Sequence, residues 1–264
     1  MVIKCPKCKS KKFWQLSDKR LKCVACKLRF SNPKKKVKIE KPLLRKIVQE
    51  FLLEHSTNII LARVKVSKYK LLKTLTLIRI VMTLDVPDIF SGIVEVDETY
   101  LGGQMKNRNA RERRKYGINR RGFGTIKQPV FGILCRAGKV WAKVVDDTEA
   151  KDLLPLIEKQ VLKGSVVCSD GWRGYTGLAT KGYVHRLVDH AKKEYTDGKG
   201  HHINGLEGFW GYMKRKLAAR GGIRREKLPI FVGEYVWKYN HRNLNLKEQE
   251  NRVVSIFFQY IRSE

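Results

Sequence analysis

The sequence predicts an α/β fold preceded by two small modules, and three observations lead to this prediction. Four cysteines are clustered in the first 33 residues, helical periodicity follows to about residue 90, and apolar strand-like runs then alternate with amphipathic helices. A chain of 264 residues is long enough for one sizeable core and one or two small modules. We therefore expect three domains, 1–33, 34–90 and 91–264.

The charge balance predicts a polyanionic partner. Lys and Arg number 56 against 25 Asp and Glu, a formal net charge of +31. A folded domain gains no stability from such an excess, because like charges repel in the compact state. Nucleic acid is the commonest partner of such a protein, and double-stranded DNA or RNA binding is our main hypothesis. A ribosome-associated protein and a binder of anionic membranes are the alternatives.

The apolar runs are too short for a membrane protein. None reaches the roughly 18 residues that a membrane span needs. The N-terminus also lacks the apolar region of a signal peptide. We expect no contact with a membrane and a soluble cytoplasmic protein, associated with the nucleoid if its partner is DNA.

The clustered cysteines have the spacing of a zinc ribbon. Two Cys-x-x-Cys pairs, Cys5 with Cys8 and Cys23 with Cys26, are separated by 14 residues, and two such knuckles complete a tetrahedral four-sulfur Zn²⁺ site. The segment is too short to bury a core, so the metal would supply its folding energy. A redox pair or coincidence is the alternative, and the partner of the ribbon, DNA or protein, stays open. Cys135 and Cys168 lie in apolar runs and fit small buried hydrophobic residues.

A charged linker, 34–41, leads to a helical module. The periodicity predicts helices over 43–53 and 58–64, the second capped at Ser56-Thr57, and a third from a cap at Ser67 to about residue 81. A short helix, a tight turn and a capped helix are typical of a helix-turn-helix, although any three-helix packing unit gives the same pattern. The residues expected to face DNA are Lys68, Lys70 and Lys73.

Beyond residue 90, strands and helices follow the order of an RNase H-like α/β domain. The predicted strands and helices, in chain order, are strands 93–97, 128–134 and 140–145, helix 150–161, strands 166–169 and 183–188, and helix 204–219. The strands are mostly apolar, which indicates a sheet covered on both faces.

A basic insertion, 101–127, lies between the first two predicted strands. It holds nine Lys or Arg, one acidic residue (Glu112) and five glycines. It cannot bury an apolar face, so we expect a flexible loop that becomes ordered on DNA. A merely solvated charged loop is the alternative. The candidate DNA contacts here are Arg113, Arg114, Lys115, Arg120 and Arg121.

Three carboxylates are the candidate catalytic residues. Asp97 and Asp170 each end a predicted strand, and ligands of open α/β sheets bind outside the carboxyl ends of strands. Glu207 lies at the edge of the apolar stripe of the helix 204–219, and Lys214 lies along the same edge, where it would suit a DNA phosphate. The alternatives are a cap or turn for each aspartate and a capping box of Asn204 with Glu207.

The motifs around these carboxylates resemble a known family. The segments Val94–Gly103, Ser169–Tyr175 and Asn204–Trp210, followed by Lys214-Arg215 and by Tyr239–Arg242, are similar to prokaryotic insertion-sequence transposases of the ISXO2-like group, which carry an N-terminal zinc ribbon and a DDE catalytic domain. The resemblance covers the chain from Cys5 to about Arg242.

The resemblance implies the roles of the site residues. It places the acidic triad on Asp97, Asp170 and Glu207, with two Mg²⁺ or Mn²⁺ ions, and makes Lys214 and Arg215 DNA contacts. Some relatives have Asn or His in place of the glutamate, so the third position stays open. The other candidates for it are Asn204, His202, Asp189 and Glu194.

The implied reaction is DNA cutting and joining by in-line phosphoryl transfer, first by water and then by the freed 3′-OH. Tyr100 and Tyr175 are then packing or DNA-stacking residues rather than nucleophiles. Because two DNA ends must be held together, we expect a homodimer or a larger assembly. A non-catalytic DNA-binding regulator and a structure-specific Mg²⁺-dependent nuclease are the alternatives.

Overall fold

The computed structural model describes residues 5, 7–18, 20–31, 39–87, 89–103, 110–116, 127–136, 138–188 and 204–263. The chain forms two compact units, one of Met1–Leu77 with Glu250–Glu264 and one of Ile78–Gln249. The three domains predicted from the sequence stay a prediction. Most of the last helix, which lies within the predicted domain 91–264, belongs to the first unit.

The N-terminal part of the first unit is a small antiparallel sheet of β1 (Phe13–Gln15), β2 (Arg20–Cys23) and β3 (Arg29–Ser31). The rings of Phe13 and Phe30 meet edge to face with centroids 5.4 Å apart. These two rings are half-buried, and among the described residues of this sheet segment the buried apolar ones are Leu21, Cys5 and Cys23. Such a sheet has little apolar surface to bury, as expected of a metal-stabilised module.

The first unit continues with α1 (Lys41–Leu52), α2 (Thr57–Val64) and the first part of α3 (Lys68–Leu84), and ends with α8 (Leu246–Ser263). The predicted caps form: Ser56 Oγ accepts from the Ile59 N–H at 3.4 Å and Ser67 Oγ from the Lys70 N–H at 3.3 Å. Lys65, with a φ of 45°, ends α2. The predicted order of helix, turn and capped helix is confirmed, and its DNA-reading role stays a prediction.

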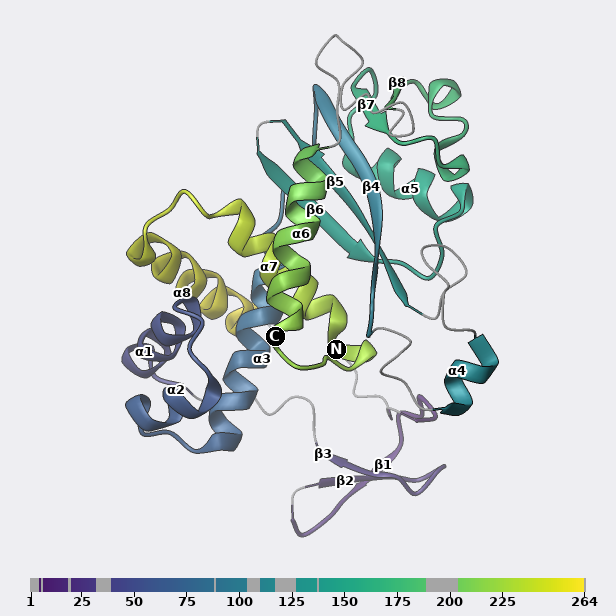
Figure 1. Cartoon of the computed structure of the whole chain (residues 1–264). Helices are drawn as coiled ribbons and strands as arrows, with labels where there is room; N and C mark the ends of the chain where they lie inside the picture. Colours follow the sequence, from purple (N-terminus) through teal and green to yellow (C-terminus); the bar gives the residue numbers. More distant parts are fainter. Residues whose placement is uncertain are drawn as a thin grey trace. The chain divides into compact units, whose positions relative to one another are not determined.

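The second unit is built on a five-stranded mixed sheet of order β6-β5-β4-β7-β8 (Figure 1). The central strand β4 (Ile93–Leu101) pairs antiparallel with β5 (Gln128–Cys135) and parallel with β7 (Val166–Ser169). The outer strands are β6 (Lys139–Val144), antiparallel to β5, and β8 (Val184–Leu187), parallel to β7.

Helices cover both faces of this sheet, as the apolar strands predicted. On one face, α5 (Ala150–Gln160) packs its Leu153 and Ile157 into a core with strand residues of β4 and β5. On the other face, α6 (Asn204–Ala218) and α7 (Leu228–Asn240) form a second core with the sheet. Figure 1 shows α6 in front of β4 and β5.

Two expectations from the sequence are corrected by the structure. The first strand was predicted to end at Asp97, but β4 continues to Leu101, because β5 pairs with it as far as Leu101 opposite Gln128. The insertion was predicted to be a flexible loop, yet it contains α4 (Ala110–Tyr116). This stretch has no Gly or Pro and consists largely of strong helix formers, which favours a helix there.

In the described residues, we find no helix with the length and apolarity that crossing a membrane requires.

A buried ion-pair network links three helical segments of the second unit. Glu234 on α7 is fully buried; its Oε2 accepts from Arg79 Nε and its Oε1 from Arg220 Nη2, both at 2.7 Å. The Lys238 ammonium lies 3.3 Å from the same carboxylate. Three cations therefore share one buried carboxylate.

We expect Glu234→Gln to destabilise the second unit by about 3–5 kcal/mol, because it removes the buried negative charge that pairs with Arg79, Arg220 and Lys238, at nearly unchanged volume. The urea midpoint of unfolding, followed by tryptophan fluorescence, measures the change. Glu226→Gln, at an exposed position, is the matched control and should stay within about 0.5 kcal/mol of the parent. Equal midpoints for the two variants would contradict this account.

Candidate functional site

The parallel pairing of β4 with β7 brings Asp97 on β4 to the level of Asp170, which directly follows β7. Glu95 pairs with Cys168, so continuing the register by two residues sets Asp97 opposite Asp170. β7 ends at Ser169, and Asp170 turns the chain out of the sheet, its Oδ1 accepting from the Trp172 N–H at 3.0 Å. Although Asp97 is in the middle of β4, it lies where the neighbouring strand ends. This is the edge at which α/β sheets bind ligands.

Ionisation of the Asp97 carboxyl is unfavourable in this position. Burial first, and then the nearby carboxylates Glu98 and Asp170, raise its pKa to about 7. The hydrogen bond that Trp210 Nε1 donates to Asp97 Oδ2 at 2.9 Å acts in the opposite direction. Crowded carboxylates of this kind are relieved by a bound cation, and oxygen ligands are those that Mg²⁺ and Mn²⁺ prefer.

Glu98 is a further carboxylate of this site that sequence reasoning missed. Burial, opposed by a hydrogen bond from Tyr175 and assisted by Asp170, raises its pKa to about 7. Tyr175 donates to Glu98 Oε2 at 2.6 Å and is fully buried, which excludes it as a DNA-stacking residue. The sequence carried one sign of this role: a glutamate on the face of β4 that otherwise presents Val94 and Val96 to the core.

A second missed residue, Glu95, fixes the start of α6. Its carboxylate is 1% exposed, and its Oε2 accepts from the Leu206 N–H at 2.8 Å. This bond satisfies a helix N-terminal donor from the sheet, and the negative charge suits that end of the helix. A Cβ on Gly205 would lie 3.0 Å from Glu95 Oε2, so the glycine permits the close approach.

A glycine on the next strand lets α6 lie close to the sheet over Asp97. Gly132 on β5 pairs with Asp97, and a Cβ there would lie 2.6 Å from the Trp210 ring. Together with the bond from Trp210 to Asp97, this contact sets the helix along β4. Leu206 thus lies at the level of Glu95, and Trp210 at the level of Asp97.

Glu207 follows Leu206 directly, in the first turn of α6, and its side chain is exposed. Asn204 is the first residue of the helix, and Glu95 binds the Leu206 N–H, so the capping box of Asn204 with Glu207 stays an alternative. The carboxylates that act on the pKa of Asp97 are Glu98 and Asp170. Among the described residues, the acidic groups do not form a set of three or more with ligand atoms within metal-bridging distance. The structure therefore brings Asp97 and Asp170 together, and Glu207 as the third ligand stays a prediction.

The other candidates for the third position differ in whether they can be located. Asn204 begins α6. His202, Asp189 and Glu194 lie outside the described residues.

The predicted DNA contacts occupy several elements. Lys214 and Arg215 lie on α6, and both are largely exposed. Partial burial lowers the pKa of Lys214, and the Asp97 carboxylate opposes this change. The Lys214 ammonium therefore lies within electrostatic reach of Asp97. On α3, Lys68 is exposed, and Lys70 and Lys73 are half-buried. The remaining candidates belong to the insertion: α4 carries Arg113, Arg114 and Lys115, while Arg120 and Arg121 lie outside the described residues.

The predicted zinc site is formed by the four cysteines, whose Sγ atoms all lie within 4.8 Å of one another. Two of these Sγ–Sγ distances are 3.5 Å, between Cys5 and Cys26, and 3.4 Å, between Cys8 and Cys23. Zn–S bonds of about 2.3 Å in a tetrahedron put sulfurs roughly 3.8 Å apart, which matches this spacing.

The two knuckles have the same backbone form, which supports their common role. In each, the Lys after the second cysteine donates its N–H at 3.0 Å to the carbonyl of the first, Lys9 to Cys5 and Lys27 to Cys23. Both lysines have a positive φ, 59° and 58°. A four-cysteine cluster of this geometry can bind Zn²⁺.

Comparisons with known proteins agree with the resemblance seen in the sequence. Residues 89–240 match the family model described as "ISXO2-like transposase domain". A curated protein of Haemophilus influenzae (strain ATCC 51907 / DSM 11121 / KW20 / Rd), named "Uncharacterized transposase-like protein", is 30% identical over 124 residues, 47% of this chain and 94% of that protein. The matched range 89–240 includes the positions of Asp97, Asp170 and Glu207.

Proposed function

Since this chain belongs to the ISXO2-like family of insertion-sequence transposases, we propose that it cuts DNA at the ends of an element and joins the freed 3′-OH to target DNA. The observation that carries this proposal is the position of Asp97 on β4 and of Asp170 directly after β7, the adjacent parallel strand, inside the family-matched region. Two carboxylates at the ligand-binding edge of an α/β sheet are what metal-dependent phosphoryl transfer requires.

The sheet supports an RNase H-like assignment for the second unit. Its central strand is antiparallel to one neighbour and parallel to the other, in the order β6-β5-β4-β7-β8. We keep the domains 1–33, 34–90 and 91–264 as part of this proposal, with 34–90 as a DNA-binding module and 1–33 as a zinc ribbon that binds DNA or a protein.

Asp97, Asp170 and Glu207 would hold two Mg²⁺ or Mn²⁺ ions, and the donor set fits such ions. Hard divalent cations prefer carboxylate oxygens, and the raised pKa of Asp97 reflects its burial first and then the neighbouring charges of Glu98 and Asp170. In-line displacement at phosphorus is the chemistry that such a pair of ions supplies.

The chain's own residues would prepare this site. Trp210 orients one oxygen of Asp97, and the turn bond from Trp172 orients one oxygen of Asp170. Glu95 anchors the first turn of α6, from which Glu207 would reach the site. Lys214 would bind a phosphate of the substrate strand next to Asp97. No nucleophilic side chain is needed.

A joining assay tests this function. Purified protein is incubated with Mg²⁺, a target plasmid and a labelled duplex that carries the sequence at the end of the element encoding this chain. We expect labelled plasmid as the joined product. Cleavage without joining would instead indicate a nuclease, and a mobility shift without cleavage would indicate a DNA-binding regulator. Sedimentation of the protein–DNA complex tests the proposed homodimer or larger assembly.

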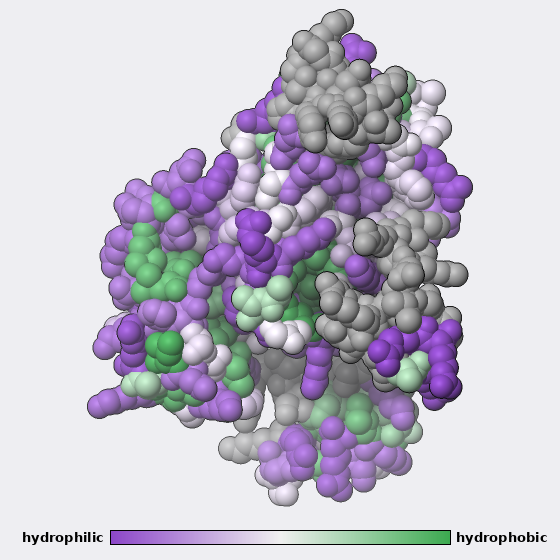
Figure 2. Space-filling model, in the orientation of Figure 1, coloured by the Kyte–Doolittle hydropathy of each residue, from purple (hydrophilic) through white to green (hydrophobic). Residues whose placement is uncertain are grey.

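Binding to DNA should weaken steeply with salt. The chain has a net charge of +31, and on the face drawn in Figure 2 hydrophilic residues cover much of the described surface. Each phosphate neutralised adds about 0.9 to the slope of log K against log salt, so six or more contacts would weaken binding by about 10³-fold or more between 50 and 200 mM. Fluorescence anisotropy at graded salt measures the slope.

The insertion provides a variant for this measurement. Replacing Arg113 and Arg114 together by Gln should lower the slope by roughly 1.8, because two phosphate contacts are lost. The matched control replaces Lys159, in the last turn of α5, and Lys163, which follows that helix. Both are exposed, and their replacement should leave the slope unchanged. A flat salt response of the parent chain would contradict a broad contact with the DNA backbone.

A further inference from the structure

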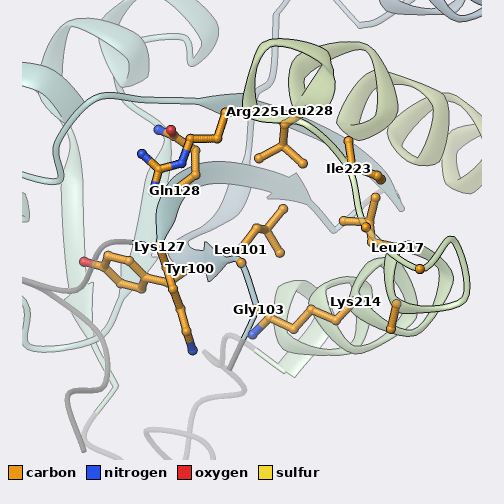
Figure 3. A pocket seen from close by; sticks show the side chains of 14 residues that line it. Tyr100, Leu101, Gly103, Lys127, Gln128, Lys214, Leu217, Ile223, Arg225 and Leu228 are labelled. Atoms are coloured by element: carbon orange, nitrogen blue, oxygen red, sulfur yellow. The ribbon is translucent and has the colours of Figure 1, made fainter. Parts of the chain in front are cut away.

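A pocket with two chemically different sides lies beside the candidate site (Figure 3). It has a volume of about 710 Å³ and is formed where β4 ends, with α6 and the segment that leads to α7 as its other walls. Small-molecule sites typically have volumes of about 300–1,000 Å³. The pocket is therefore large enough for a nucleotide and too small for a duplex.

One side of the pocket is apolar. Leu101 at the end of β4, Leu217 on α6 and Leu228 at the start of α7 line it, and Figure 3 shows the three side chains grouped together. Leu101 and Leu228 belong to the core between the sheet and these helices and are only 8% and 7% exposed. This side is consequently rigid, and it suits the face of a base or a sugar, which gains by leaving water.

The other side of the pocket is basic. Lys127 and Lys214 line it, while Arg225 lines the opposite end of the pocket beside Gln128. Among the described residues that line the pocket, none is acidic. Lys127 and Lys214 are near enough to repel each other, since Lys127 contributes to the lowered pKa of Lys214. Cations that converge in this way favour an anion between them, and a phosphate is the anion that this protein's substrate offers.

The pocket is close enough to the candidate site to bind the same DNA strand. Leu101 is four residues after Asp97 on the same face of β4, a distance of about 13 Å at roughly 3.3 Å per residue. Stacked nucleotides rise by about 3.4 Å each, so the pocket is within about four nucleotides of a phosphate held at Asp97. Lys214 connects the two places, because it lines the pocket and interacts with Asp97.

We propose that this pocket binds one unpaired nucleotide of the element-end DNA, with the base against the leucines, a phosphate between Lys127 and Lys214, and Arg225 lining the other end. The pocket cannot admit a base that stays stacked in a duplex, so the nucleotide must leave the stack. Its capture would fix the strand at a set distance from Asp97 and Asp170. This inference rests on the function proposed above.

The test places the fluorescent base 2-aminopurine at each of the four positions on either side of the cleaved phosphate, in both strands of the element-end duplex. Its fluorescence rises when it leaves the stack. With the full chain and no added divalent cation, we expect a several-fold rise at one position, while anisotropy reports that the complex has formed.

Two pairs of variants connect the signal to the pocket. Ala218 lines the pocket at the end of α6, and its neighbour Ala219 is equally exposed but does not line it. We expect Ala218→Phe to abolish the rise and to reduce strand joining about tenfold, the range for one lost base contact, and Ala219→Phe to leave both unchanged. Arg225→Gln should weaken the signal, and Arg224→Gln, exposed and outside the pocket, should retain it.

The outcomes separate this inference from the proposed function. A formed complex with no rise at any position, or a rise that survives Ala218→Phe, overturns the nucleotide pocket even if the parent chain joins DNA. A rise lost only in the pocket variants supports the pocket, even if the parent chain joins nothing and the proposed function fails.

Discussion

Asp97→Asn is expected to abolish strand joining while DNA binding is retained. Asparagine keeps the size of the side chain and can still accept the Trp210 hydrogen bond, but it loses the negative charge that would bind a divalent cation. We expect the single-turnover joining rate to fall by at least about 10³-fold, the upper range for losing one electrostatic group of an active site. Affinity for the element-end duplex, measured by anisotropy, should stay within about twofold, since the phosphate contacts come from basic residues.

Stability measurements distinguish this loss from unfolding. The pKa of Asp97 in the folded chain, about 7, lies above the ordinary value of 3.8. The folded state therefore holds a proton that the unfolded state releases, and stability without Mg²⁺ falls as pH rises from about 4 to about 7. Asp97→Asn should reduce that fall and raise the melting temperature at pH 8.

The matched control for the activity is Asp146→Asn, an exposed aspartate of the same unit, which should join at the parent rate. Joining by Asp97→Asn at a similar rate would remove Asp97 from the chemistry. A lower melting temperature at pH 8 would show instead that the carboxylate stabilises the fold.

Local patterns in the sequence were sufficient to predict most helices and strands and two carboxylates of the candidate site. Apolar runs mark β4 and β7, and an aspartate after each run predicts two acidic groups at one edge of a parallel pair, as found for Asp97 and Asp170. The spacing of the cysteines likewise predicts the geometry of a site made within one short segment. The mixed α/β order of strands and helices follows from the same periodicities.

Features that depend on a distant partner could not be predicted in this way. The length of β4 is set by β5, which continues pairing to Leu101. The role of Glu95 depends on Leu206, 111 residues away, and that of Glu98 on Tyr175, 77 residues away. A carboxylate on a strand shows in the sequence as a break in the apolar pattern, but its partner is known only when the chain is folded. The place of Glu207 depends on α6, which these long-range contacts hold against the sheet.

Removal of zinc is expected to unfold the N-terminal ribbon and to leave the α/β unit folded. Within residues 5–31, the described apolar core outside the metal site consists of little more than Leu21 and the Phe13–Phe30 pair, which cannot offset the conformational entropy of ordering the segment. Structural Zn²⁺ supplies about 10–16 kcal/mol in comparable modules, so folding of the ribbon should depend on the ion.

Cys8→Ser should lose the expected one equivalent of zinc per chain, and protease should then rapidly cleave the segment before residue 39. The matched control is Cys135→Ser, a cysteine outside the cluster, which should keep its zinc and its resistance. The α/β unit has cores of its own on both faces of its sheet, so its melting transition should be the same in both variants. A ribbon that stays protease-resistant in metal-free Cys8→Ser would mean that its three strands are held by packing alone, contrary to the small number of apolar contacts they make.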